Sequence, residues 1–176
     1  MSVQATGYSP TVRALHWGSA ALIMVLVGSG LRAGLSDDPA TKVQALQVHL
    51  PVAILVLALT VARLVNLARG LANPPPLVSV PAWQAGLAHW VHRLIYAALL
   101  ALLASGIAMS VLSGLPGALY GGAPMPELTD LPPRLGHRVA AIALGLLLAG
   151  HVGAALYHHF VLKDATLQRI WRGRGE

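Results

Sequence analysis

The sequence contains no cysteine, and only 10% of its 176 residues are charged. Without cysteine there can be no disulfide, no iron–sulfur cluster, no thiolate-ligated haem and no covalent C-x-x-C-H haem attachment. The low charge excludes an ordinary soluble domain, in which about a quarter of the residues are charged. In place of charge the chain has hydrophobic residues, which make up 56% of it.

Four long apolar stretches account for this composition. A helix needs about 20 predominantly apolar residues to cross a bilayer. We predict spans at about residues 11–31, 44–67, 84–112 and 134–162. Polar or proline-rich segments at residues 32–42, 73–76 and 113–133 separate them, because such backbone cannot lie in hydrocarbon. The expected fold is therefore all-α, a single domain over residues 1–176 that forms an integral membrane four-helix bundle. No internal repeat is evident.

The basic residues gather at the ends of the spans. This is typical of membrane topology, and it argues against nucleic acid as a partner despite a net charge of +6. If both termini lie on one side, that side carries Arg13, Arg63, Arg69, Arg93, Lys163, Arg169, Arg172 and Arg174, and the other carries Arg32, Lys42, Arg134 and Arg138. The excess predicts a multi-pass protein with both termini in the cytoplasm. We expect the first stretch to be a span and not a cleaved signal peptide, because no small-x-small cleavage site precedes Asp37.

Several histidines lie inside the predicted spans, where an ionisable side chain is costly and marks a candidate functional site. His137 and His151 are 14 residues apart on the last span, about four turns or 21 Å, so they lie on nearly the same face. Spans one and three run outwards from the cytoplasm, and spans two and four run back. Comparing depths pairs His49 with His137 near the outer side and His16 with His151 near the inner side.

Two histidine pairs suit the two axial positions of a haem better than zinc, which needs three or four ligands at one point. Helix bundles commonly hold such cofactors between facing side chains. We therefore expect two stacked haems between the helices. Glycines would leave room near the ligands, namely Gly18, Gly28, Gly30, Gly136, Gly145, Gly150 and Gly153. The alternatives are histidines that bond to a neighbouring helix, and glycines that serve ordinary helix packing.

Four other histidines are harder to assign. His89 and His92 lie near the start of the third span, where an interfacial role is expected, and His92 is the best substitute if one of the four ligands is wrong. His158 and His159 lie at the end of the last span. They either anchor the helix at the interface or, with His158 as the candidate, exchange protons with a quinone there.

Two arginines are candidate partners for haem propionates. Arg63 lies one or two turns inside the end of the second span, where it could also snorkel to the interface. A buried carboxylate would favour a bidentate guanidinium, and Arg13 could serve the inner haem in the same way.

The order and content of these elements resemble the bacterial cytochrome b561 family, four-helix di-haem proteins of the inner membrane. The resemblance covers nearly the whole chain. It rests on Ala14-Leu15-His16-Trp17, Gln47-Val48-His49, Gly86-Leu87-Ala88-His89-Trp90-Val91-His92, Gly150-His151, His158-His159-Phe160 and Lys163-Asp164-Ala165-Thr166-Leu167. The 14-residue histidine spacing on the last span is more specific than any of these short motifs.

The resemblance implies two haem b groups with axial histidines from the first, second and fourth helices, which matches the pairs obtained from depth. Small stand-alone members look like superoxide oxidases, which take electrons from superoxide at the periplasmic face and reduce ubiquinone. Arg134, Arg138 and Lys42 could attract superoxide there. The chain would work in membrane lipid as a monomer or homodimer. Two alternatives stay open: a cytochrome b subunit of a dehydrogenase or hydrogenase, and a histidine-lined metal transporter.

Overall fold

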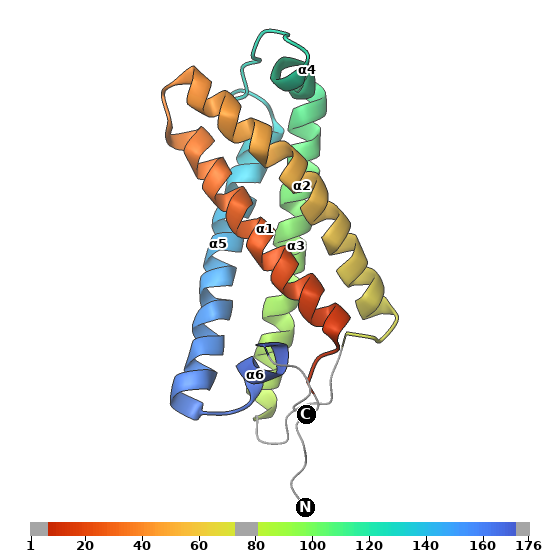
Figure 1. Cartoon of the computed structure of the whole chain (residues 1–176). Helices are drawn as coiled ribbons and strands as arrows, with labels where there is room; N and C mark the ends of the chain where they lie inside the picture. The colour runs from red at the N-terminus through yellow and green to blue at the C-terminus, as the bar shows by residue number, and fades with distance from the viewer. Residues whose placement is uncertain (1–6, 73–80, 172–176) are drawn as a thin grey trace, which may run out of the picture.

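Four long helices dominate the computed structural model, which describes residues 7–72 and 81–171. They are α1 (Pro10–Leu35), α2 (Pro39–Ala68), α3 (Ala82–Ser113) and α5 (Pro133–Tyr157), the last of which continues as a π-helical segment, η1 (His158–Leu162). All four are long and apolar enough to cross a membrane, with mean hydropathies of 1.6 to 2.2. The predicted all-α four-helix membrane class is therefore confirmed (Figure 1).

The helices begin where capping residues and prolines favour it. Ser9 accepts a hydrogen bond from the amide of Val12, and Asp38 accepts from the amides of Ala40 and Thr41. In each case a proline follows at the first helical position, where its missing N–H is not needed. The separator expected over residues 32–42 is consequently shorter than predicted, because only residues 36–38 interrupt the helices.

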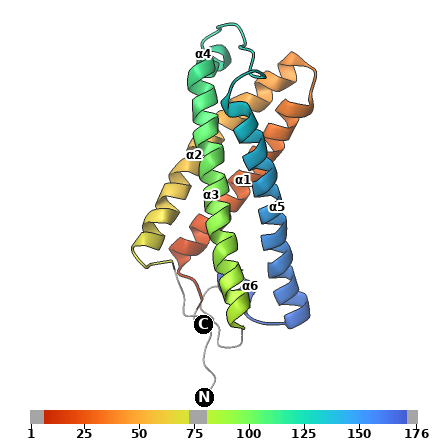
Figure 2. The same ribbon diagram turned by 180° about the vertical axis from the view of Figure 1, so that it is seen from behind.

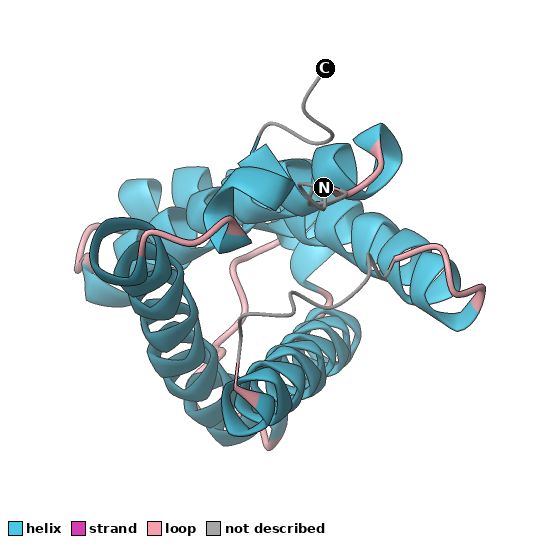
Figure 3. Ribbon diagram, turned by 90° about the horizontal axis from the view of Figure 1, so that it is seen from below, coloured by secondary structure: helices cyan, strands magenta, loops and turns pink. Residues whose placement is uncertain are grey.

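The four helices form two antiparallel pairs, α1 with α2 and α3 with α5 (Figures 1 and 2). Backbone packing is close within each pair and sparse between the pairs. Viewed along the bundle, the α1–α2 pair lies across from α3 and α5 (Figure 3). Many large apolar side chains point outwards, among them Met24, Ile54, Val111 and Leu146, as expected for a surface that faces lipid.

A short helix, α4 (Leu115–Tyr120), lies within residues 113–133, which the sequence suggested to be loop only. It packs against α2 at a carbonyl that Pro51 leaves without its helical N–H donor. That carbonyl, of Gln47, accepts a 2.9 Å hydrogen bond from the Tyr120 hydroxyl, and the Gln47 side chain donates to the carbonyl of Leu119. The α4 contact thereby fixes α2 within one turn of His49.

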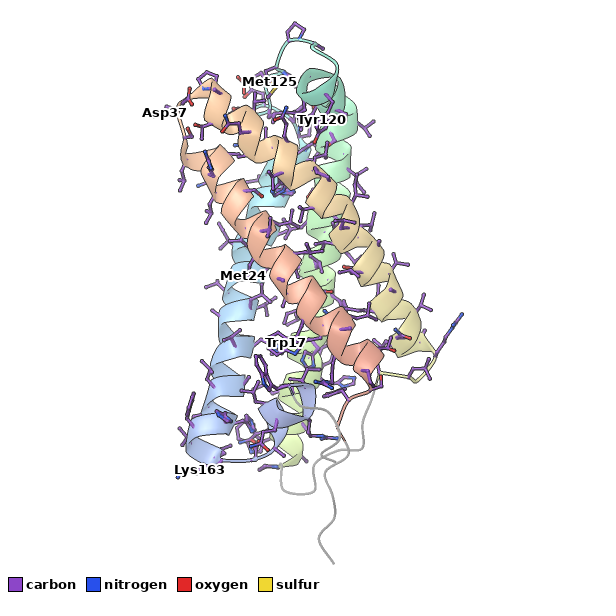
Figure 4. All side chains as sticks on the ribbon, viewed as in Figure 1. Trp17, Met24, Asp37, Tyr120, Met125 and Lys163 are labelled. Atoms are coloured by element: carbon purple, nitrogen blue, oxygen red, sulfur yellow. The ribbon has the colours of Figure 1, made fainter. Side chains whose placement is uncertain are left out.

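The opposite end of the bundle, called the terminal end below, is covered by α6 (Thr166–Trp171). Arg13 Nη2 donates to the carbonyl of Trp171, and Trp17 Nε1 donates to that of Ile170. Trp17 points towards this covering segment (Figure 4). The predicted proline link at residues 73–76 and the basic residues Arg172 and Arg174 lie outside the described residues.

Candidate functional site

The four long helices carry their distinctive residues at a spacing of seven, which is about two turns or 10.5 Å along each helix. This spacing creates three layers across the bundle. The layer towards the terminal end contains His16, Arg63, His92 and His151; the middle layer contains Ile23, Val56, Leu99 and Leu144; and the layer towards the opposite, loop end contains Gly30, His49, Gly106 and His137. We call them the inner, middle and outer layers.

The middle layer is apolar and closed. Its four aliphatic residues are all buried and, with Leu103, form the hydrophobic core cluster of the protein. Val56 is fully inaccessible. The middle layer therefore separates the polar groups of the inner layer from those of the outer layer.

The outer layer holds His49 on α2 and His137 on α5, both half-buried and within electrostatic reach of each other. The Nδ1 atom of His49 lies 3.0 Å from the hydroxyl of Ser29 on α1. The Nδ1 atom of His137 likewise lies 3.0 Å from the hydroxyl of Ser105 on α3. Each imidazole is thus held by a serine of its partner helix, which leaves its Nε2 edge for another contact.

The inner layer brings three imidazoles together. The ring centroids of His16 and His151 are 6.2 Å apart, and those of His92 and His151 are 5.1 Å apart. His16 and His151 are half-buried, whereas His92 is exposed. The interfacial role expected for His92 is therefore too limited, because its ring also lies against a predicted ligand. His89 makes no such ring contact among the described residues.

Arg63 completes the inner layer. Its guanidinium lies over the ring of Tyr96, 5.3 Å from the centroid, and interacts electrostatically with the three inner histidines. Within residues 7–72 and 81–171 it forms no ion pair with a carboxylate. The nearby Arg13 has a buried Nε atom without a hydrogen-bond partner among the described residues. Both arginines can therefore accommodate a carboxylate that the chain itself does not supply.

A histidine–aspartate pair lies beyond the inner layer, at the end of α5. His158 Nδ1 and Asp164 Oδ2 are 2.5 Å apart, and Asp164 also accepts from the amide of Thr166. Partial burial opposes ionisation of Asp164, but hydrogen bonds from Thr166 and His158 hold the pKa of this carboxyl below its usual value. The π-helical segment and the left-handed conformation of Lys163 turn the chain back so that this pair can form.

These residues fit haem b as a ligand. A non-covalent haem would be held by histidine nitrogens and by cations for its carboxylates, and helices on opposite sides of the bundle offer both. In the described part of the chain, no three His, Asp or Glu side chains are grouped as a tetrahedral metal site would need. Of the predicted ligands, the structure brings His49 near His137 and His16 near His151. The number of haems stays a prediction.

Sequence reasoning missed three contributors, namely Ser29, Ser105 and Gly106. The seven-residue spacing could have found Gly106, since it repeats His16, Ile23 and Gly30 of α1 as His92, Leu99 and Gly106 of α3. The same comparison shows an approximate internal repeat, in which α1–α2 corresponds to α3–α5. The repeat is not evident in the sequence because it is confined to positions that face the bundle interior.

The family described as prokaryotic cytochrome b561 matches residues 7–173. The chain is also 30% identical over 170 residues to cytochrome b561 homolog 1 of Escherichia coli strain K12, covering 93% of this chain and 96% of that protein.

Proposed function

This chain belongs to the prokaryotic cytochrome b561 family and is an integral membrane cytochrome b of electron transfer, and we propose that it oxidises superoxide and reduces ubiquinone. The observation that carries the proposal is the separation of two histidine layers by an apolar layer. We propose one haem b at each histidine layer, where His49 and His137 would hold the outer haem and His16 and His151 the inner one.

Each haem, when bound, supplies a one-electron iron couple. The overall reaction balances when two superoxide anions give up one electron each and become oxygen, while one ubiquinone takes up two electrons and two protons. The chain's own task is to hold the donor at one end and the acceptor at the other, on either side of the middle layer.

Cationic side chains at the loop end support the use of an anionic donor. Arg134 lies in the first turn of α5 and interacts electrostatically with His137. Lys42 interacts with Glu127, whose carboxylate also caps the amide of Thr129. Since this carboxylate offsets Lys42, we assign the attraction of superoxide mainly to Arg134.

The His158–Asp164 pair supports quinone reduction at the terminal end. Quinol formation needs protons, and an imidazole that bonds to a carboxylate through Nδ1 keeps Nε2 available to take up a proton and pass it on. His158 begins η1, seven residues beyond His151 of the inner layer. We propose that it donates protons to ubiquinone, while Asp164 holds its ring in position.

The proposed orientation places the loop end in the periplasm and both termini in the cytoplasm of a bacterial inner membrane. The distribution of Lys and Arg supports it. Superoxide would then be oxidised outside, and protons for the quinol would be taken from inside.

The test uses purified full-length protein in liposomes that contain ubiquinone. We expect two haems per chain in the dithionite-reduced spectrum, and quinone reduction that requires superoxide and consumes two superoxide anions per quinol. One haem per chain, or reduction without superoxide, would overturn the proposal. Stable co-purification with an iron–sulfur subunit, together with absent superoxide activity, would instead identify a cytochrome subunit of a larger dehydrogenase.

A matched pair of charge variants sharpens this test. Arg134→Gln should slow superoxide oxidation several-fold at low salt, and the difference should shrink near 1 M salt, where the Debye length falls from about 10 Å to about 3 Å. Arg69→Gln removes the same charge from the end of α2 at the terminal end and should leave the rate unchanged. Equal effects of both variants would contradict steering at the loop end.

A further inference from the structure

Ser29 and Ser105 occupy equivalent positions in the approximate repeat. Each precedes the glycine of the outer layer, and each contacts the histidine on the antiparallel partner helix. Neither the histidine spacing nor the depth argument requires a serine here. Because the same contact occurs in both helix pairs, the hydroxyl beside each outer histidine needs an explanation.

The hydrogen-bond directions indicate that each serine fixes the tautomer of the histidine that it contacts. A hydroxyl has one proton, and that of Ser29 is directed to backbone carbonyls, of Val25 at 2.8 Å and of Leu26 at 3.2 Å. We infer that the oxygen of Ser29 accepts at its contact with His49, so that Nδ1 of His49 carries the proton. The carbonyl of Leu26, which can only accept, also approaches this ring. The unprotonated nitrogen of His49 is consequently Nε2.

The second pair repeats these directions. Ser105 donates to the carbonyl of Ala101 at 2.7 Å, with Leu102 at 3.0 Å, and therefore accepts from Nδ1 of His137. The carbonyl of Leu102 approaches that ring as well. Both outer histidines are thus held in the tautomer whose Nε2 lone pair can bind iron.

The adjacent glycines complete the contact. A Cβ atom on Gly30 would lie 3.3 Å from Cε1 of His49, closer than most such contacts in proteins. A Cβ atom on Gly106 would lie 3.5 Å from Cε1 of His137, an ordinary van der Waals distance. A glycine therefore lets the imidazole lie directly against the helix, and the requirement is stricter at Gly30.

We propose that Ser29-Gly30 and Ser105-Gly106 form two equivalent contact sites. They hold His49 and His137 as Nε2 ligands of the outer haem and tune its reduction potential. This inference rests on the proposed outer haem. A hydrogen-bond acceptor at Nδ1 makes imidazole a stronger donor to the metal and favours ferric over ferrous iron. The two serines are positioning residues, since they act on the haem only through the histidines.

The experiment is a visible-spectrum redox titration of Ser29→Ala, Ser105→Ala and the double variant in the full-length haem-loaded protein. We expect each single variant to raise the ferrous-to-ferric ratio of the outer haem severalfold at a fixed applied potential, and the double variant about tenfold, which for a one-electron couple corresponds to about 59 mV. The inner haem should keep its potential, and the low-spin ferric electron paramagnetic resonance signal of the outer haem should shift.

Two further variants separate the hydrogen bond from general packing. Ser19→Ala removes a fully buried α1 hydroxyl that bonds to the carbonyl of Leu15, and among the described contacts it has no histidine partner, so it should leave the outer potential unchanged. Ser29→Thr keeps the hydroxyl, so its outer haem should have the same potential as in the wild-type protein. An outer potential unaffected in the double variant, or moved equally by Ser19→Ala, would overturn the proposal.

The glycines give an independent readout. Gly30→Ala should lower outer haem occupancy more than Gly106→Ala, because only the former puts a methyl group closer to the ring than ordinary contact. Equal outer haem occupancies in the two variants would contradict the proposed contact site at Gly30. These outcomes differ from failure of the proposed function, since loss of the second haem in the wild-type protein would be seen before any variant is made.

Discussion

At the scale of single residues, Arg63 is the charge that most needs an explanation. A guanidinium inside a membrane-spanning helix is costly unless it is paired, and in the described part of the chain Arg63 contacts an aromatic ring and no carboxylate. It occupies the position in the repeat that corresponds to His151. The inner layer therefore has one cation where an exact duplication would have a fourth histidine, which suits a cofactor carrying carboxylates.

We predict that Arg63→Gln lowers the reduction potential of the inner haem. The reduced haem has one positive charge fewer, so a nearby guanidinium stabilises it. Two unit charges roughly 10 Å apart at an effective dielectric constant of about 20 interact by about 1–2 kcal/mol, which is on the order of 50 mV. A redox titration should show this downward shift in the inner haem alone. Arg69→Gln, on the same helix but exposed, is the control, and an equal shift there would contradict the assignment.

The sequence predicted those residues of the site that stand out by their side-chain type alone. A histidine in an apolar span is conspicuous, and counting residues from the helix ends was enough to expect His49 beside His137, which the structure places within electrostatic reach. Ser29 and Ser105 could not be found in this way, because a serine in a membrane helix usually bonds to its own backbone. Only the position of the neighbouring helix shows that their second contact is a histidine.

At the scale of elements, the hydrophobic runs located the four helices and missed the short ones. Long apolar stretches specify helices because every backbone group in lipid must bond internally. The six-residue α4 and the π-helical turn have no such constraint, and each depends on a tertiary contact. The contact is Tyr120 with the Gln47 carbonyl in one case and His158 with Asp164 in the other.

The α6 segment should become less firmly attached to the bundle in acid. The pKa of Asp164 is held below its usual value near 3.8. Its ionised form therefore stabilises the folded segment fully above that value, and the stabilisation is lost as the pH falls through the lower pKa of the folded state. A spin label at Gln168→Cys, an exposed site in a chain without cysteine, should become mobile over this range.

Asp164→Asn should make the same label mobile at neutral pH, because the amide cannot replace the ionised partner of His158. Asp130→Asn, in an exposed turn at the loop end, should have no effect on it. If the label in Asp164→Asn stays as restrained as in the parent protein and responds to acid in the same way, the carboxylate is not what holds α6.

At the scale of the whole molecule, the three layers explain why a protein with so small an apolar core can still have one defined arrangement of its helices. Only the middle layer is a conventional apolar core, whereas the inner and outer layers bring polar side chains into the interior of the bundle. Sparse packing between the helix pairs is consistent with cofactors that complete the interior. Haem removal should accordingly loosen the contact between the pairs more than the contacts within each pair.

The proposed orientation of the molecule can be tested because the chain lacks cysteine, so that a single introduced thiol has no background. Ala123→Cys lies exposed at the loop end, and Gln168→Cys lies exposed on α6 at the terminal end; neither changes a charge. Because Lys and Arg are retained on the cytoplasmic side, a membrane-impermeant maleimide should label Ala123→Cys in right-side-out vesicles and Gln168→Cys only in inverted ones. The opposite pattern would reverse the orientation and place the outer histidine layer towards the cytoplasm, where periplasmic superoxide could not reach it.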